Sequence, residues 1–143
     1  MARKRSNDTD LTFPAWDLIR AERYFVRPWH FLQERARSAF VMSSRGCPFG
    51  CTFCASHATL GKRFRARSPG LVVDEIEHLY RAHGVEEILF IDDNFTFDRD
   101  RTAAICEEIL RRGLDISWRT PNGVRIDTLD EVEYHRHGGI LQY

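Results

Sequence analysis

The sequence lacks any long apolar run and any apolar leader. No stretch of about 18 apolar residues, the length that crosses a bilayer, occurs in the chain, so we expect no membrane-spanning helix and no membrane partner. The first residues are polar and charged, unlike a secretory leader. We therefore expect a cytoplasmic protein, and the reducing cytosol argues against a framework of disulfides.

Charge of neither sign is in excess, since 21 basic residues balance 21 acidic ones. Residues 1–37 carry eight Lys and Arg against five Asp and Glu, and residues 38–143 carry 13 against 16. A mildly acidic domain lacks the basic surface that nucleic acid requires, so nucleic acid is not the expected partner. The basic segment 62–67 is interpreted as a solvated loop, and the alternative is a segment that binds phosphate or RNA.

Cysteine is scarce, and three of the four cysteines lie close together. Cys47, Cys51 and Cys54 form the spacing C-x3-C-x2-C, among proline and glycine residues that mark a loop. Disulfides between thiols this close would be strained, whereas such a loop can direct its sulfurs to one metal centre. A structural zinc ion usually has four protein ligands, but a 4Fe-4S cluster held by three cysteines keeps one iron free for an outside ligand.

Two other interpretations of these cysteines remain open. His57 follows Cys54 by three residues, a spacing that fits a Cys3His zinc site without catalysis. Alternatively, the thiols are buried structural groups, although the turn residues around them favour a loop. The fourth cysteine, Cys106, falls in a helical pattern, where we expect a small core residue.

Short apolar runs and helix signals alternate along the second part of the chain. Strands are predicted at residues 39–42, 88–91, 116–119 and 140–143. Helices are predicted from Ser68-Pro69 to Gly84, from Asp98 to Gly113, and over residues 129–137. The alternation of strand and helix implies parallel pairing, so the expected fold class is α/β.

The two longer helices have predicted apolar faces. The first has apolar residues at the helical spacing i, i+4, i+7 and i+8, and these are Val72, Ile76, Leu79 and Tyr80. The apolar stripe predicted for the second consists of Ala103, Ile105, Ile109 and Leu110. Both stripes are expected to face the sheet.

Polar residues follow each predicted strand. The cysteine segment follows the first strand, Asp92-Asp93-Asn94 follows the second, and Arg119 and Asn122 lie at the end of the third. The carboxyl ends of parallel strands are where α/β folds place their sites. The alternatives are an acidic cap on a strand for Asp92 to Asn94, and surface or turn residues for Arg119 and Asn122.

The cysteine spacing, with Phe53 directly before the third cysteine, resembles the signature of the radical S-adenosylmethionine (SAM) enzymes. The resemblance implies a 4Fe-4S cluster on Cys47, Cys51 and Cys54, with SAM chelated to the free iron. An electron from the cluster then splits SAM to give a 5′-deoxyadenosyl radical, which abstracts hydrogen from a substrate. The resemblance also implies a reductant such as flavodoxin or ferredoxin, and it implies that the cofactor is bound by Phe53, Asp92, Asp93, Asn94, Arg119 and Asn122.

Three segments resemble the cobalamin-binding branch of these enzymes. They are Pro-Ala-Trp-Asp-Leu at 14–18, Asp-Asp-Asn-Phe-Thr at 92–96 where the family often has Gly-Gly-Glu, and Asn-Gly-Val-Arg at 122–125. The resemblance makes methyl transfer the reaction commonly expected. Cobalamin would bind only through a domain that we do not find in this sequence.

The resemblance implies a partial (β/α) barrel of parallel strands. The family barrel has about six strand–helix units, of which residues 37–143 supply about three, and residues 1–36 form a polar tail and an aromatic-rich linker. We therefore expect a truncated gene, a split gene or a piece of a longer protein. Either a second polypeptide completes the barrel or the fragment is marginally stable. The alternative is an inactive fragment, and the sequence does not identify a substrate.

Overall fold

The computed structural model describes residues 14–19, 23, 25 and 37–124. Two helices and three strands form its main layers: α2 (Pro69–His83), α3 (Arg99–Arg111), β1 (Ser38–Val41), β4 (Glu87–Phe90) and β5 (Ser117–Arg119). The shorter elements are η2 (Trp16–Leu18), β2 (Ser44–Arg45), α1 (Ser56–Thr59) and β3 (Arg65–Ala66). The helix predicted at 129–137 and the strand predicted at 140–143 lie outside the described residues.

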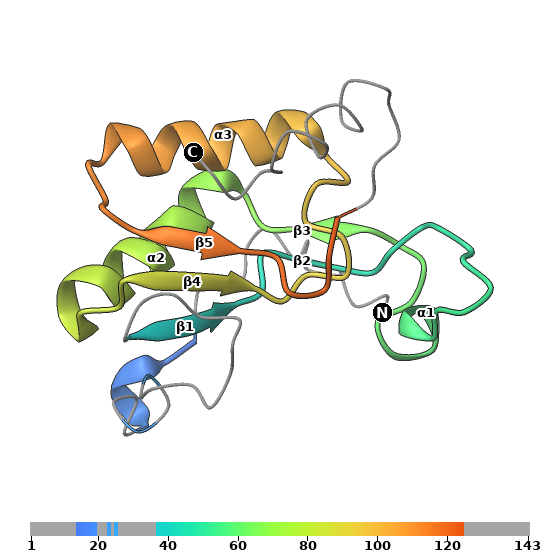
Figure 1. Ribbon diagram of the computed structural model, residues 1–143, viewed down its shortest axis with the longest axis horizontal. Helices are drawn as coiled ribbons and strands as arrows, with labels where there is room; N and C mark the ends of the chain where they lie inside the picture. The colour runs from blue at the N-terminus through green and yellow to red at the C-terminus, as the bar shows by residue number, and fades with distance from the viewer. Residues whose placement is uncertain (1–13, 20–22, 24, 26–36, 125–143) are drawn as a thin grey trace, which may run out of the picture.

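The main sheet is parallel, as the alternating pattern predicted. Its strand order is β1-β4-β5, with Val41 opposite Phe90 and Leu89 opposite Arg119. The carboxyl ends of the three strands therefore lie at one edge (Figure 1). This arrangement confirms the α/β fold class and is the arrangement of a partial (β/α) barrel.

The core lies between one face of this sheet and the two longer helices. Side chains alternate along each strand, so Ala39 and Val41 are buried while Phe40 between them is 57% exposed. Helices α2 and α3 contact each other and cover the buried face. The core residues they contribute are Val72, Val73, Ile76 and Leu79 from α2, and Ile105 and Ile109 from α3.

The ends of α2 and α3 lie where the sequence predicted them. Gly84 ends α2 with φ +63°, and Gly113 follows α3 with φ +62°, the left-handed conformation that favours glycine. The Asp98 side chain accepts a hydrogen bond from Arg101 N at 3.0 Å, which caps α3. Ser68 lies at the N-cap of α2 but makes no side-chain capping bond there.

The predicted apolar stripe of α3 was wrong for two of its four members. Leu110 is 77% exposed, and Ala103 is also exposed. The buried face instead runs through Arg101, Ile105 and Ile109, which are four residues apart and therefore share one side of the helix. An arginine thus occupies the first turn of the buried face, a position that an apolar pattern does not reveal.

Two aromatic residues of the linker pack on α2. Phe25 is 2% exposed and belongs to the core, and its ring centroid lies 5.6 Å from that of Trp16. The Trp16 indole N–H donates to Glu75 Oε1 at 3.3 Å. Both aromatic residues therefore pack against the core. Within the described residues, no helix is long and apolar enough to cross a membrane.

Candidate functional site

The three clustered cysteines lie on a loop whose two ends are paired. Strands β2 and β3 form a short antiparallel ribbon, with Ser44 opposite Ala66 and Arg45 opposite Arg65. We call residues 46–64 the cysteine loop, and the segments 43–45 and 65–67 its base. Arg67 N also donates to Ser43 O at 3.0 Å, which closes the base one residue further out. Figure 1 shows the loop extending from the base beyond the carboxyl ends of the parallel strands.

The two arms of the loop approach each other closely at Gly46. This glycine has φ +82°, and a Cβ atom there would lie 2.3 Å from the carbonyl oxygen of Arg63. Only glycine fits this contact without a shift of backbone. The next residue continues the pairing, because Cys47 N donates to Gly61 O at 3.3 Å.

Asp92 binds the base of the loop. Its side chain is buried, with 1% exposed, and its Oδ1 accepts from Ser43 N at 2.7 Å. Its Oδ2 accepts from the hydroxyls of Ser43 and Ser44, each at 2.6 Å. Three donors therefore surround this carboxylate, and they connect the ends of β1 and β4.

Asp93 and Asn94 differ from Asp92 in their surroundings. Asp93 is half-buried, and its Oδ2 accepts from Gly46 N at 3.1 Å. Asn94 is 6% exposed, and its Oδ1 accepts from the Thr96 hydroxyl at 3.3 Å. Of the two acidic residues, Asp93 is thus the more accessible and lies directly against the start of the cysteine loop.

The residues predicted at the end of the third strand lie in different places. Asn122 donates from Nδ2 to the carbonyl oxygens of Ile91 and Asp92, at 3.1 and 3.2 Å. Arg119 instead forms an ion pair with Glu87, from Nε to Oε1 at 2.9 Å, and Glu87 is fully buried. The structure therefore brings Asn122 to the acidic segment and directs Arg119 toward the amino end of β4.

The cysteine side chains are accessible but do not converge. Cys51 is exposed, Cys47 and Cys54 are half-buried, and all three are free thiols. Within the described residues, no group of three His, Cys, Asp or Glu side chains lies close enough to hold a metal ion. This applies equally to a zinc site completed by His57, which is exposed on α1. Both metal sites therefore stay predictions.

Two local hydrogen bonds order the chain around Cys54. Ser56 N donates to Cys54 Sγ at 3.5 Å. Cys54 N donates to Cys51 O at 3.1 Å and closes a tight turn between the two cysteines. Between them Phe53 is 92% exposed and presents its ring at the surface of the loop.

Three phenylalanines that the sequence analysis did not select connect the cysteine loop to the segment after β4. The ring centroid of Phe97 lies 5.7 Å from that of Phe49 and 4.7 Å from that of Phe64. Phe49 and Phe64 come from opposite arms of the loop, and Phe97 follows the acidic segment. The three phenylalanines follow no helix or strand spacing in the sequence, so a sequence pattern does not predict this contact.

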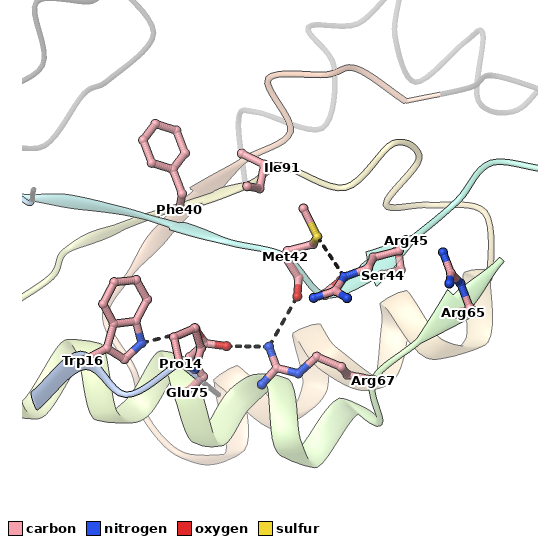
Figure 2. Close-up of a pocket in the computed structure, with 11 residues that line it drawn as sticks. Pro14, Trp16, Phe40, Met42, Ser44, Arg45, Arg65, Arg67, Glu75 and Ile91 are labelled. Atoms are coloured by element: carbon pink, nitrogen blue, oxygen red, sulfur yellow. Dashed lines mark hydrogen bonds and ion pairs between the residues drawn. The ribbon is translucent and has the colours of Figure 1, made fainter. Parts of the chain in front are cut away.

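A pocket of about 420 Å³ adjoins the base of the loop, within the usual size of small-molecule sites. In Figure 2, Phe40 and Ile91 lie on one side, and Trp16 and Glu75 lie on the other. Its lining includes three arginines and one carboxylate: Arg45, Arg65, Arg67 and Glu75. Arg67 forms an ion pair with Glu75, and Arg45 Nε donates to Met42 Sδ at 3.3 Å. The sequence analysis did not identify this pocket.

Cys106 lies apart from the other three cysteines, on α3. It is half-buried, and burial raises the pKa of its thiol above the ordinary value of 9.0. A raised pKa disfavours the thiolate, which is the form that binds metal. Because it lies on α3 and outside the loop, Cys106 serves as a reference for the cysteines of the loop.

Comparison with known proteins gives one family match and several relatives. The model of the radical SAM superfamily matches residues 41–139. An uncharacterized methyltransferase of Pyrococcus horikoshii is 37% identical over 125 residues, which cover 87% of this chain and 25% of that protein.

Two further relatives have more specific names. An anaerobic magnesium-protoporphyrin IX monomethyl ester cyclase of Cereibacter sphaeroides is 33% identical over 138 residues, covering 94% of this chain and 22% of that protein. A cytidylyl-2-hydroxyethylphosphonate methyltransferase of Streptomyces wedmorensis is 33% identical over 123 residues, covering 85% and 23%. The chain thus spans about a quarter of the length of these curated relatives.

Proposed function

Because this chain belongs to the radical SAM superfamily, we propose that it is the part of an enzyme that holds a 4Fe-4S cluster and SAM. Cys47, Cys51 and Cys54 would be the cluster ligands. One observation carries the proposal: the three thiols lie on a single loop whose base is bonded to the carboxyl end of a parallel sheet, beside Asp92. Thiolates are the usual ligands of iron–sulfur clusters, so the donor set fits the group.

The residues around the loop have distinct proposed tasks. When bound, the cluster supplies the electron that splits SAM into methionine and a 5′-deoxyadenosyl radical, which takes hydrogen from the substrate. Asp93 would bind the SAM ammonium group, because it is accessible and adjoins the loop. Asn94, which is 6% exposed, stays a prediction from the resemblance. Phe53 offers an exposed aromatic ring for a planar group such as adenine.

The resemblance named three further residues for the cofactor. We do not assign any of them to direct contact with SAM. Asp92 has its three donors in the base of the loop, so we assign it to holding that base. Asn122 would hold the acidic segment through its bonds to Ile91 O and Asp92 O. Arg119 is paired with Glu87, and we leave it out of the SAM site.

We propose methyl transfer as the reaction class. Two of the three relatives reported above carry the name methyltransferase. The segment Asp92 to Thr96 supports the cobalamin-binding branch, although cobalamin would need a domain outside this chain. Flavodoxin or ferredoxin would deliver the electron, and further barrel strands, from a longer chain or a second polypeptide, would enclose the substrate and exclude water.

Anaerobic reconstitution with iron and sulfide tests the proposal. We expect a brown protein with about four irons, since three thiolates can hold a 4Fe-4S cluster, and an electron paramagnetic resonance (EPR) signal of the reduced cluster that changes with SAM. Cys51→Ala should abolish the cluster, whereas the matched control Cys106→Ala should keep it. Stoichiometric zinc without charge-transfer absorbance would contradict the proposal. Loss of that zinc in His57→Ala would then establish the Cys3His site.

A further inference from the structure

One buried arginine reaches both ends of the cysteine loop. Arg101 lies in the first turn of α3 and is 8% exposed. Its Nε donates to Arg67 O at 2.9 Å, and its Nη2 donates to Ser43 O at 2.8 Å. Ser43 and Arg67 are the outermost residues of the base, so a single guanidinium bonds to the segment that enters the loop and the segment that leaves it.

Ser43 is held from two sides. Arg101 and Arg67 N donate to its carbonyl oxygen, while Asp92 accepts from its backbone N–H and its hydroxyl. Burial lowers the pKa of Arg101, and the negative charges of Asp92 and Asp98 act against that change. The position of the base relative to α3 and β4 is thus set by directional, charge-assisted bonds, which are stronger than neutral ones.

We propose that Arg101 is a positioning residue for the cysteine loop, fixing the loop relative to the carboxyl ends of the strands. Beyond its base, the loop is connected to the rest of the molecule through Phe97 and Asp93. A shift at the base would therefore displace the cysteines relative to Asp93. The inference rests on the proposed function in one respect, that the loop holds the cluster to which SAM binds.

The arginine fork is essential to this role. Its two donors reach two carbonyl oxygens at once, whereas a lysine carries its charge on a single nitrogen. Arg101→Lys therefore keeps the positive charge near Asp92 but cannot reproduce both bonds. Arg112→Lys is the matched control, because Arg112 lies near the other end of α3 and pairs with Asp74, Glu77 and Glu108 instead.

Amide hydrogen exchange of the metal-free 143-residue chain, followed by NMR, is the first measurement. Arg101→Lys should speed exchange about tenfold at Cys47 and Arg67, whose N–H groups bond across the loop and its base. Exchange at Ile91, which donates to Val41 O in the sheet, should stay at the parent rate. Arg112→Lys should leave Cys47 and Arg67 unchanged.

The second measurement uses the reconstituted chain. Arg101→Lys should keep its iron content, and it should need about tenfold more SAM for half of the change in the EPR signal of the reduced cluster. Arg101→Gln, which keeps one donor without a charge, is measured alongside in case the lysine variant does not fold. We expect both Arg101 variants to need more SAM than the parent chain.

The two measurements separate the possible failures. If exchange and SAM response are the same in the Arg101 variants as in Arg112→Lys, Arg101 does not position the loop, even where the cluster assembles. If the parent chain assembles no cluster, the proposed function fails, while the exchange rates at Cys47 and Arg67 still decide whether Arg101 holds the base.

Discussion

Two neighbouring carboxylates differ in burial and in hydrogen bonding although they are identical residues. Asp92 and Asp93 are adjacent in sequence, but the first has 1% of its surface exposed and accepts three hydrogen bonds. The second is half-buried and accepts one from Gly46 N. The resemblance to the family implied that both bind the cofactor. A pattern of residue types could not separate them, because it does not reveal which oxygen atoms already accept hydrogen bonds.

Replacing Asp92 should mainly affect stability, whereas replacing Asp93 should mainly affect the response to SAM. Asp92→Ala leaves three buried donors without an acceptor and should lower the free energy of unfolding by about 3 kcal/mol. Asp93→Ala removes one partly exposed bond and should cost less than about 1 kcal/mol, yet weaken the SAM response of the reconstituted cluster. Urea unfolding and a SAM titration measure the two effects. Equal loss of stability in both variants would show that their tasks are not divided.

At the scale of the elements, local signals were predictable and long-range contacts were not. Helix α2 begins after Ser68 and ends at Gly84 as predicted, because proline in the first turn and glycine after the last turn act locally. The parallel sheet also followed from the order of strands and helices. In contrast, Arg101 and Ser43 are 58 positions apart, and no period or motif relates them.

The cysteine loop also combines local features that were predictable with long-range contacts that were not. Its proline and glycine residues favoured a loop over buried structural thiols, and Cys51 is exposed while Cys47 and Cys54 are half-buried. The contact of Phe97 with Phe49 and Phe64, and the pocket beside Trp16, depend on segments that meet only after folding. Sequence therefore predicts which residues can do chemistry, and tertiary contacts decide how they are held.

Glycine substitutions in the loop test its close backbone approach. Gly46→Ala combines left-handed strain of about 1–2 kcal/mol with a Cβ placed 2.3 Å from Arg63 O. We expect a lower melting temperature and impaired cluster assembly. Gly61→Ala has φ +77° but nothing within 4 Å of its Cβ, so it should show the strain alone.

Gly50→Ala, with nothing within 4 Å of its Cβ, should be close to neutral. The same melting temperature in the Gly46 and Gly61 variants would argue that the approach of the two arms contributes nothing to stability. Iron content after reconstitution then reports whether the close approach matters to the cluster.

In the whole described molecule, α3 connects two distant regions. Arg101 near its first turn reaches the base of the cysteine loop, and Arg112 just beyond its last turn reaches α2. The two positions are about 16 Å apart along a helix. The ionic contacts between α2 and α3 are partly exposed to solvent and lie away from the loop, so pH is expected to act on them without changing the cysteines' surroundings.

Acid should weaken the contacts at the far end of α3. Hydrogen bonds from Arg111 and Arg112 lower the pKa of Glu108 from 4.5 to about 2. A carboxyl group whose pKa is lower in the folded chain stabilises it above the unfolded value, and that stability is lost as pH falls from 4.5 toward 2. Glu108→Gln should therefore flatten the pH dependence of unfolding in this window, as measured by urea titrations. Its neighbour Glu107→Gln is the control, and an unchanged slope in Glu108→Gln would contradict the assignment.

The closed base of the cysteine loop has a consequence for how such a chain can be altered. Because Ser43 pairs with Arg67 and Gly46 approaches Arg63, the residues between them form an insertion whose two ends lie close together. Lengthening an insertion of this kind is inexpensive, since each doubling of a flexible loop costs only about 0.6 kcal/mol. We therefore expect the segment to be exchangeable. A graft with another cysteine spacing, checked by its melting temperature, should leave the sheet and helices intact while changing the metal group that the proposed site would hold.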